Sequence, residues 1–257
     1  MPGVKVTNRT WARCGVASRA RFARSGFTLI DILVSLTVIA VLISLLLPSL
    51  SGVRELTRRV VCASNARQHG LGLAMFLEDS KGVFPESKFE AKQRADDKGQ
   101  LQNMMIARTS ETPAEWDGLG VLYATEYLHA PQVFYCPSHT GEHPYAAYAS
   151  LWSDATSGQV VINYHYRGSL TASSAQQPDR VSMITDGLRT RSDYNHKVGS
   201  NVLRADFSVK WFADPARAVA QSLPSMEGEL AAADKVQDAW LTIDGSAHTT
   251  TAPASMP

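Results

Sequence analysis

The chain has 257 residues, with 25 Lys and Arg, 24 Asp and Glu, and a formal net charge of +1. The charge is unevenly placed. Residues 1–26 hold six of the basic residues and no acid, so the remaining 19 face 24 acidic residues, a net charge of −5. A mildly acidic protein behind a basic N-terminus gives no reason to expect nucleic-acid binding.

Residues 27–47 form an apolar run with a single charge, Asp31. At about 1.5 Å per residue this run spans roughly 31 Å as a helix, enough to cross the hydrocarbon core of a membrane. A carboxylate near the end of such a helix is costly, which indicates a function and a partner for the charge. The basic flank favours a cytoplasmic N-terminus, with the rest of the chain across the membrane.

Two ordinary interpretations of this run remain open. One is a cleaved secretory signal, but its apolar region would be only about 7–15 residues long. The other is a signal anchor that is never cut. Neither accounts for an acid four residues after the Gly26–Phe27 junction.

Pro48 follows the run and is expected to kink the helix, because it removes a backbone donor. Beyond it, apolar residues at spacings of three and four predict a helix to about Leu77. This stripe consists of Val53, Leu56, Val60, Ala63, Gly70, Ala74 and Leu77. Residues 48–80 are therefore expected to continue the helix in amphipathic form, with a stripe on which a globular head can pack.

Residues 81–248 are expected to form that head, and residues 249–257 a frayed tail. Short helices are predicted at residues 101–108, 118–128 and 225–240. The β-prone segments are 132–136, 160–166, 181–185, 201–205 and 208–212. The predicted fold class is α+β, with one long N-terminal helix packed on a small antiparallel sheet.

Cys62 and Cys136 are the two cysteines outside residues 1–26. In an oxidising compartment they are candidates for a disulfide that ties the helix to the head. The alternative is two free, half-buried thiols, because the sequence does not establish that their Cα atoms come within bonding range. Two cysteines without Cys-x-x-Cys spacing fall short of the usual ligand count of a metal site.

The stretch Arg24-Ser25-Gly26-Phe27-Thr28-Leu29-Ile30-Asp31 resembles the type IV prepilin signature. The resemblance implies a pilin-like fold, cleavage between Gly26 and Phe27 by prepilin peptidase, and N-methylation of Phe27. It also implies assembly through the N-terminal helix into a type IV pilus or a type II secretion pseudopilus. Asp31 stands where this family has Glu, and would neutralise the Phe27 amine during assembly. Pilins commonly carry a proline at the position of Pro48.

Four further stretches are similar to planctomycete prepilin-like proteins, related to type II secretion protein G, that carry a His-x9-Asp-Gly motif. They are residues 61–68, 134–138, 182–187 and 195–212. His196 and Asp206 have the spacing of the motif, whereas Phe207 stands where that family has Gly. The resemblance covers residues 24–85 and patches of residues 115–212.

His196 and Asp206 are interpreted as structural residues that hydrogen-bond to hold a hairpin turn between residues 201–205 and 208–212. A calcium site is the alternative, with Asp186, Asp193 and Asp206 as weak candidate ligands. A hydrolase would use His196 with a serine, but no Gly-x-Ser-x-Gly elbow is present. No catalytic residue and, apart from calcium, no cofactor is therefore expected.

Together these features predict a pseudopilin or minor pilin, a structural subunit of a type II secretion or type IV pilus-like filament. Its expected partners are prepilin peptidase, other pilin subunits, the assembly machinery and the membrane. Its expected location is the inner membrane, crossed once, with a cytoplasmic N-terminus and a periplasmic head, and the filament after assembly. The alternative is a membrane-anchored envelope module that binds a glycan or a protein and does not polymerise.

Overall fold

The computed structural model describes residues 26–89, 104–111, 113–153, 158–168, 177–196, 198–229 and 232–245. Of residues 48–51 it describes the helical backbone but not the side chains. The expected leader up to residue 25 and the expected tail at residues 249–257 lie outside the described residues. The chain divides into two compact units, residues 1–49 and 50–257.

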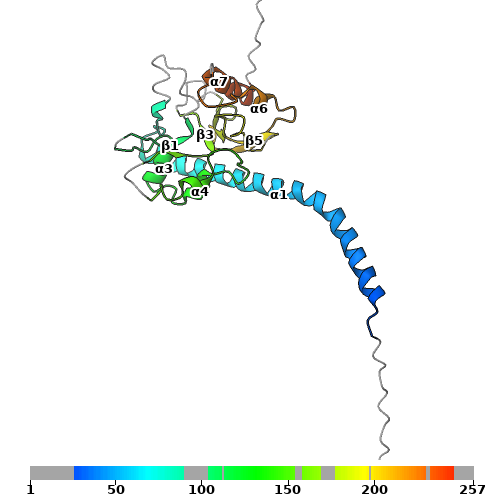
Figure 1. Ribbon diagram of the computed structural model, residues 1–257. Coiled ribbons are helices and arrows are strands. Elements are labelled where there is room, and N and C mark those ends of the chain that lie inside the picture. Colours follow the sequence, from blue (N-terminus) through cyan, green and yellow to red (C-terminus); the bar gives the residue numbers. More distant parts are fainter. Residues whose placement is uncertain are drawn as a thin grey trace, which may run out of the picture. The chain divides into compact units, whose positions relative to one another are not determined.

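The first helix, α1, runs without a break from Leu29 to Asp79 (Figure 1). This confirms the prediction of one continuous helix to about Leu77. The helix stops where Gly82 takes a φ of +82° and donates a hydrogen bond of 2.8 Å from its N–H to the carbonyl of Leu77. Pro48 lies within α1, but its side chain is outside the described set, so the kink stays a prediction.

The prediction that the head packs on the apolar stripe is wrong for the first half of that stripe. Val53, Leu56 and Val60 are 58%, 61% and 62% exposed. The buried face of α1 is made of Cys62, Asn65, Ala66, His69, Gly70 and Leu73, of which Gly70 alone belongs to the predicted stripe. The head therefore packs on a face that is rotated around the helix axis from the predicted stripe.

Two polar residues explain why apolar periodicity missed this buried face. The side-chain amide of Asn65 donates to the carbonyl of Tyr135 at 3.3 Å, and Nε2 of His69 lies 3.1 Å from the carbonyl oxygen of Val133. Buried polar groups are tolerated when they are hydrogen-bonded in this way. The helix face is thus complementary to loop carbonyls of the head rather than uniformly apolar.

The remaining helices are short: α3 (Gly120–Ala124), the 3-10 helix η2 (Pro131–Phe134), α4 (Tyr145–Tyr148), α6 (Ala218–Ser222) and α7 (Ala232–Ile243). The predictions for residues 118–128 and 225–240 are confirmed in part by α3 and α7. The strand predicted at residues 132–136 is wrong, because Pro131 opens a helical turn there. The helix predicted at residues 101–108 is wrong where Ile106–Arg108 forms strand β1.

The strands form two antiparallel sheets. One pairs β1 with β2 (Val160–Val161). The other has the order β3-β4-β5-β6, formed by Tyr164–Tyr166, Ser182–Asp186, Gly199–Arg204 and Val209–Ala213. Each strand of this larger sheet pairs with the next along the chain, as the predicted β-segments and hairpin require. The fold is therefore α+β with antiparallel sheets, as the sequence indicated.

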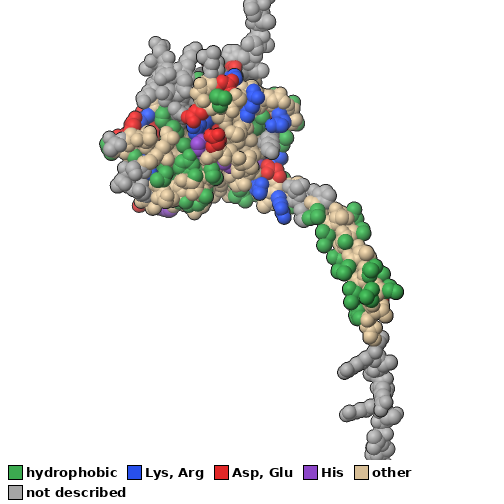
Figure 2. Space-filling model, in the orientation of Figure 1, with side chains coloured by type: hydrophobic (Ala, Val, Ile, Leu, Met, Phe, Trp, Pro, Cys, Tyr) green, Lys and Arg blue, Asp and Glu red, His purple; other side chains and the backbone are tan. Residues whose placement is uncertain are grey.

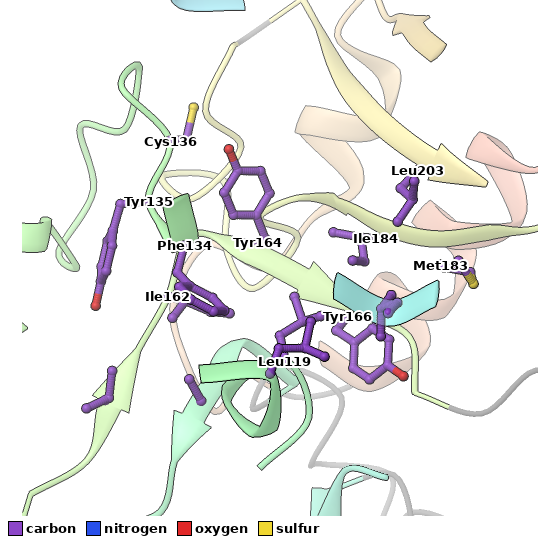
Figure 3. Packing of buried hydrophobic residues seen from close by; sticks show 14 of the residues in the cluster. Leu119, Phe134, Tyr135, Cys136, Ile162, Tyr164, Tyr166, Met183, Ile184 and Leu203 are labelled. Atoms are coloured by element: carbon purple, nitrogen blue, oxygen red, sulfur yellow. The ribbon is translucent and has the colours of Figure 1, made fainter. Parts of the chain in front are cut away.

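Helices cover both faces of the larger sheet, because neighbouring residues of a strand point to opposite sides. Leu203 of β5 packs in one buried cluster with Cys62 and Leu73 of α1. Figure 3 shows Leu203 and Ile184 within this cluster. Its neighbour Val202 packs in a second cluster with Trp240 of α7. Since both faces are covered, all five positions of β4 are buried.

Candidate functional site

The segment Leu29–Leu47 is, among the described residues, the one helical stretch long and apolar enough to cross a membrane. Its mean hydropathy is 2.7, and none of it is buried. Figure 2 shows hydrophobic side chains crowding the visible face of this segment. Exposed apolar surface of this extent is unfavourable in water, so lipid or other apolar helices would stabilise the segment.

The residues expected at the processing junction form a capping arrangement at the start of α1. The backbone N–H of Thr28 donates to Oδ2 of Asp31 at 3.0 Å, and the N–H of Asp31 donates back to Oγ1 of Thr28 at 3.3 Å. This reciprocal pair is a capping box, which satisfies two otherwise unpaired amides. Just before it, Phe27 is 84% exposed. The Gly26–Phe27 bond therefore precedes the first turn of the helix.

A second arrangement lies inside the head, where four residues from distant parts of the chain meet. Cys62 lies on α1, Cys136 follows η2, Asp186 ends β4, and His196 lies in the loop before β5. Their side chains are 0%, 4%, 0% and 3% exposed. The sulfur, carboxylate and imidazole atoms that they offer lie within 4.8 Å of one another.

Hydrogen bonds connect the members of this cluster. Sγ of Cys62 donates to Oδ1 of Asp186 at 2.8 Å. Nε2 of His196 lies 3.6 Å from Sγ of Cys136 and 3.6 Å from Oδ2 of Asp186. The hydroxyl of Tyr164 lies 3.1 Å from Sγ of Cys62. Figure 3 shows the Tyr164 hydroxyl and the Cys136 sulfur on the same side of the core.

Three members of the cluster are also held by residues outside it. Nδ1 of His196 donates to Oε1 of Glu55 at 2.7 Å, which fixes the proton on Nδ1 and turns Nε2 toward the cluster. The backbone N–H of Asn201 donates to Oδ2 of Asp186 at 2.8 Å, and that of Ser138 to Sγ of Cys136 at 3.4 Å. The cluster is therefore rigidly oriented.

Burial shifts the pKa values of the ionisable groups in the cluster. It raises the pKa of the Cys62 thiol well above its usual range, and it raises the pKa of the Asp186 carboxyl. Burial alone would lower the pKa of His196, but the hydrogen bond to Cys136 and the negative charge of Asp186 raise it to about 9. Burial likewise opposes ionisation of Cys136, but hydrogen bonds from Cys62 and His196 lower its pKa.

The sequence analysis placed these residues in other roles. The disulfide expected between Cys62 and Cys136 is not formed in this structure, where both are free and buried thiols. Both nevertheless belong to one cluster, in which their sulfur atoms lie within 4.8 Å of each other. The hydrogen bond expected between His196 and Asp206 is wrong, because the described bonds of His196 go to Glu55 and the cluster.

Asp206 does organise the β5–β6 turn, as predicted, but with a different partner. Its Oδ1 accepts the backbone N–H of Ser208 at 2.9 Å and the Ser208 hydroxyl at 2.6 Å. Phe207 then takes a left-handed φ of +61°, and its N–H donates to the carbonyl of Arg204. This is a three-residue hairpin loop with the left-handed position that favours Gly.

The three calcium candidates lie in different surroundings. Asp186 belongs to the buried cluster, and Asp206 lies in the exposed turn. Asp193 is buried and accepts a hydrogen bond of 2.7 Å from the Thr190 hydroxyl. The structure therefore does not bring Asp186, Asp193 and Asp206 together into one site.

Sequence reasoning missed Glu55 and the shared role of the two cysteines, Asp186 and His196. One signal was available for the four cluster residues. Cys62, Cys136, Asp186 and His196 each lie in a different one of the four stretches that resemble planctomycete prepilin-like proteins. Sequence spacing could not join them, because Cys136 follows Cys62 by 74 residues and Asp186 follows Cys136 by 50 residues.

Comparison with known proteins adds no match to this description. No protein-family model matches the chain, and neither a curated protein nor a solved structure matches it.

Proposed function

We propose that this chain is a membrane-anchored assembly subunit of the pilin type, a pseudopilin or minor pilin of a type II secretion or type IV pilus-like filament. In this proposal prepilin peptidase cuts between Gly26 and Phe27, Phe27 is N-methylated, and the mature chain polymerises through α1. The observation that carries the proposal is the exposed apolar segment Leu29–Leu47, which begins two residues after Phe27.

The apolar surface of α1 extends further than a membrane anchor needs. About 20 residues suffice to cross a bilayer. Val53, Leu56 and Val60 lie beyond that length and are still mostly exposed, at spacings of three and four. Exposed apolar residues at this spacing favour packing against the same helix of neighbouring subunits, with lipid replaced by protein during assembly.

Asp31 fits the same proposal. Its carboxylate caps the first turn of its own helix through Thr28, and Phe27 directly before the cap is exposed. After cleavage the new α-amino group would belong to Phe27. A neighbour's amine could then reach the Asp31 carboxylate without disturbing any buried contact, since both groups lie at the exposed end of the helix.

The proposal places the chain in the inner membrane, crossed once, with residues 1–26 on the cytoplasmic side and the head in the periplasm. The basic residues of that N-terminal segment support this orientation. The proposed partners are prepilin peptidase, other pilin subunits, the assembly machinery and the membrane.

A pocket beside α3 favours a second candidate, an anchored module that binds a glycan or a protein without polymerising. It is lined by Trp116, Tyr123, Ala124, Glu126, His129 and Trp152. The Trp116 and Tyr123 rings are half-buried, with centroids 5.1 Å apart. Aromatic rings with polar neighbours are suited to small polar ligands. A glycan-binding screen of the full chain in detergent tests this candidate.

The decisive test of assembly compares wild-type chain with Gly26→Leu in cells that contain the proposed machinery. The wild type should yield a mature protein that begins at methylated Phe27 and appears in sheared filaments. Gly26→Leu should remain as full-length precursor in the membrane. Gly15→Leu is the matched control, since it alters the same N-terminal segment away from the junction and should be processed normally. Normal processing of Gly26→Leu, or mature wild type that never enters filaments, would exclude the proposal.

A further inference from the structure

The buried cluster formed by Cys62, Cys136, Asp186 and His196 has the composition and geometry of a metal centre. Two sulfurs, one carboxylate and one imidazole nitrogen converge within 4.8 Å, each from a different part of the chain. We propose that these four residues bind one divalent transition-metal ion of the zinc type, in a closed four-coordinate site. This inference concerns the head alone and does not depend on assembly into filaments.

The donor atoms select the class of metal. Thiolate and imidazole ligands suit zinc and similar borderline ions, whereas calcium and magnesium take oxygen ligands. Cys62 and Cys136 supply the sulfurs, His196 supplies Nε2, and Asp186 supplies a carboxylate oxygen. These donors therefore favour a zinc-type ion over calcium. Together with the two cysteines, Asp186 and His196 give the four ligands that a structural zinc site needs.

Two of the separations between donor atoms are close to those of a tetrahedral centre. With metal–sulfur bonds of about 2.3 Å and metal–nitrogen or metal–oxygen bonds near 2.0 Å, the ligand atoms of such a centre lie roughly 3.3–3.8 Å apart. Nε2 of His196 lies 3.6 Å from Sγ of Cys136 and 3.6 Å from Oδ2 of Asp186. Sγ of Cys62 is closer to Asp186, at 2.8 Å, because its proton bridges the two atoms. Metal binding displaces that proton to solvent, and the pair then separates.

The surrounding residues hold the ligands as the outer shell of a metal site does. Nδ1 of His196 donates to Oε1 of Glu55 at 2.7 Å, so Nε2 faces the other ligands and would release its proton to solvent when an ion binds. A carboxylate behind a ligating histidine is a recurrent feature of zinc sites. Backbone N–H groups of Ser138 and Asn201 point at the Cys136 sulfur and the Asp186 carboxylate. The ligands are thus oriented before any ion enters.

Burial gives the site a structural rather than a catalytic character. All four ligands are at most 4% exposed, and the four side chains fill the tetrahedron without a vacant position for substrate. Cys62 lies on α1, while the other three ligands belong to the head. A bound ion would therefore fasten the helix to the sheet. It would also exclude a disulfide between Cys62 and Cys136, because both sulfurs would be used as ligands.

The test uses the full chain in detergent, purified under reducing conditions without chelator and then supplied with Zn²⁺ or Co²⁺. We expect one equivalent of zinc per chain by elemental analysis. The cobalt form should show the strong visible absorption of a tetrahedral site with thiolate ligands. Removing the ion with a chelator should lower the melting temperature, and adding zinc should restore it.

Variants locate the site. Cys136→Ser and His196→Gln should lose stoichiometric zinc and the cobalt spectrum. Glu55→Gln should bind zinc about 10–100-fold more weakly, because Glu55 orients His196 without touching the ion. Glu78→Gln is the matched control for Glu55→Gln, since Glu78 is exposed on the same helix and outside the cluster, and this variant should bind zinc as the wild type does.

Three results would overturn the proposal. The first is wild-type chain that is folded and reduced yet takes up neither zinc nor cobalt. The second is metal binding that survives unchanged in both Cys136→Ser and His196→Gln. The third is a Cys62–Cys136 disulfide found by peptide mass in protein taken from its native compartment. The zinc and cobalt measurements on the wild-type chain test the proposal even if a variant fails to fold.

Discussion

Glu55 and His196 are joined across 141 residues of sequence by a hydrogen bond of 2.7 Å from Nδ1 of the histidine to Oε1 of the carboxylate. Glu55 also accepts the Ser138 hydroxyl at 2.9 Å and lies 3.4 Å from Nε of Arg59. Glu55 on α1 thus contacts two loops of the head, one that holds Ser138 and one that holds His196. This makes Glu55 a point at which the helix and the head are held together.

Glu55→Ala should therefore destabilise the chain by about 1–3 kcal/mol, because it leaves the buried Nδ1 of His196 without its acceptor. Denaturant unfolding of the full chain in detergent, without added metal, measures this loss. Glu78→Ala removes an exposed carboxylate from the same helix and should change stability by less than about 0.5 kcal/mol. Equal effects of the two substitutions would contradict the assigned role of Glu55.

How far the sequence predicts this molecule depends on how local each feature is. The apolar run and the helical spacing of apolar residues beyond Pro48 predicted α1, and β-prone segments predicted β4, β5 and β6. The metal-type cluster was not foreseen, because its members are brought together only by packing α1 on the sheet. The buried face of α1 was missed for a related reason: Asn65 and His69 are polar, and their partners are loop carbonyls that periodicity cannot show.

Asp31 should be needed for assembly but not for insertion. A carboxylate at the centre of a spanning helix costs about 2.5–3.5 kcal/mol on insertion scales, and less near the end of the helix. Asp31→Ala should be inserted and cleaved but absent from sheared filaments, while Asp31→Glu should assemble. Asp31→Asn separates two causes, because it keeps an oxygen for the Thr28 N–H and removes the charge. If Asp31→Asn assembled as well as wild type, capping rather than charge would be the role of this residue.

Phe207 occupies a left-handed position at φ +61° in the β5–β6 turn, which is unfavourable for any residue with a Cβ. Phe207→Gly and Phe207→Ala both remove the ring, and they differ only in that atom. The Gly variant should therefore be more stable than the Ala variant by about 1 kcal/mol, measured by thermal or denaturant unfolding. An Ala variant as stable as the Gly variant would show that the turn relaxes to another conformation.

Gly120 at the start of α3 lies against the backbone of β1. A Cβ built there would come 1.9 Å from the carbonyl oxygen of Ala107, a contact that requires the backbone to move. Gly120→Ala should lower the melting temperature clearly, with a loss of roughly 1–3 kcal/mol typical of overpacking. Gly52→Ala is the control, because nothing lies within 4 Å of its Cβ position and Ala favours a helix. Similar melting temperatures for the two variants would rule out the close approach at Gly120.

His69 gives the head a dependence on pH. It is fully buried on α1, its ring lies against those of Phe134 and Tyr164, and Nε2 is 3.1 Å from the carbonyl oxygen of Val133. Burial lowers the pKa of His69 to about 4, from an ordinary value of 6.5. Between these values the unfolded chain binds a proton that the folded chain does not, so stability falls as pH decreases through this window.

The full shift corresponds to about 3 kcal/mol of stability that is present above pH 6.5 and lost by about pH 4. His69→Gln cannot titrate, yet its amide can still donate to the Val133 carbonyl. The difference in unfolding free energy between wild type and His69→Gln should therefore shrink as pH decreases from about 7 to 4, which isolates His69 from the carboxylates that titrate in both proteins. A difference that stayed constant over this range would mean that His69 is protonated in the folded state, or is not buried as the structure places it.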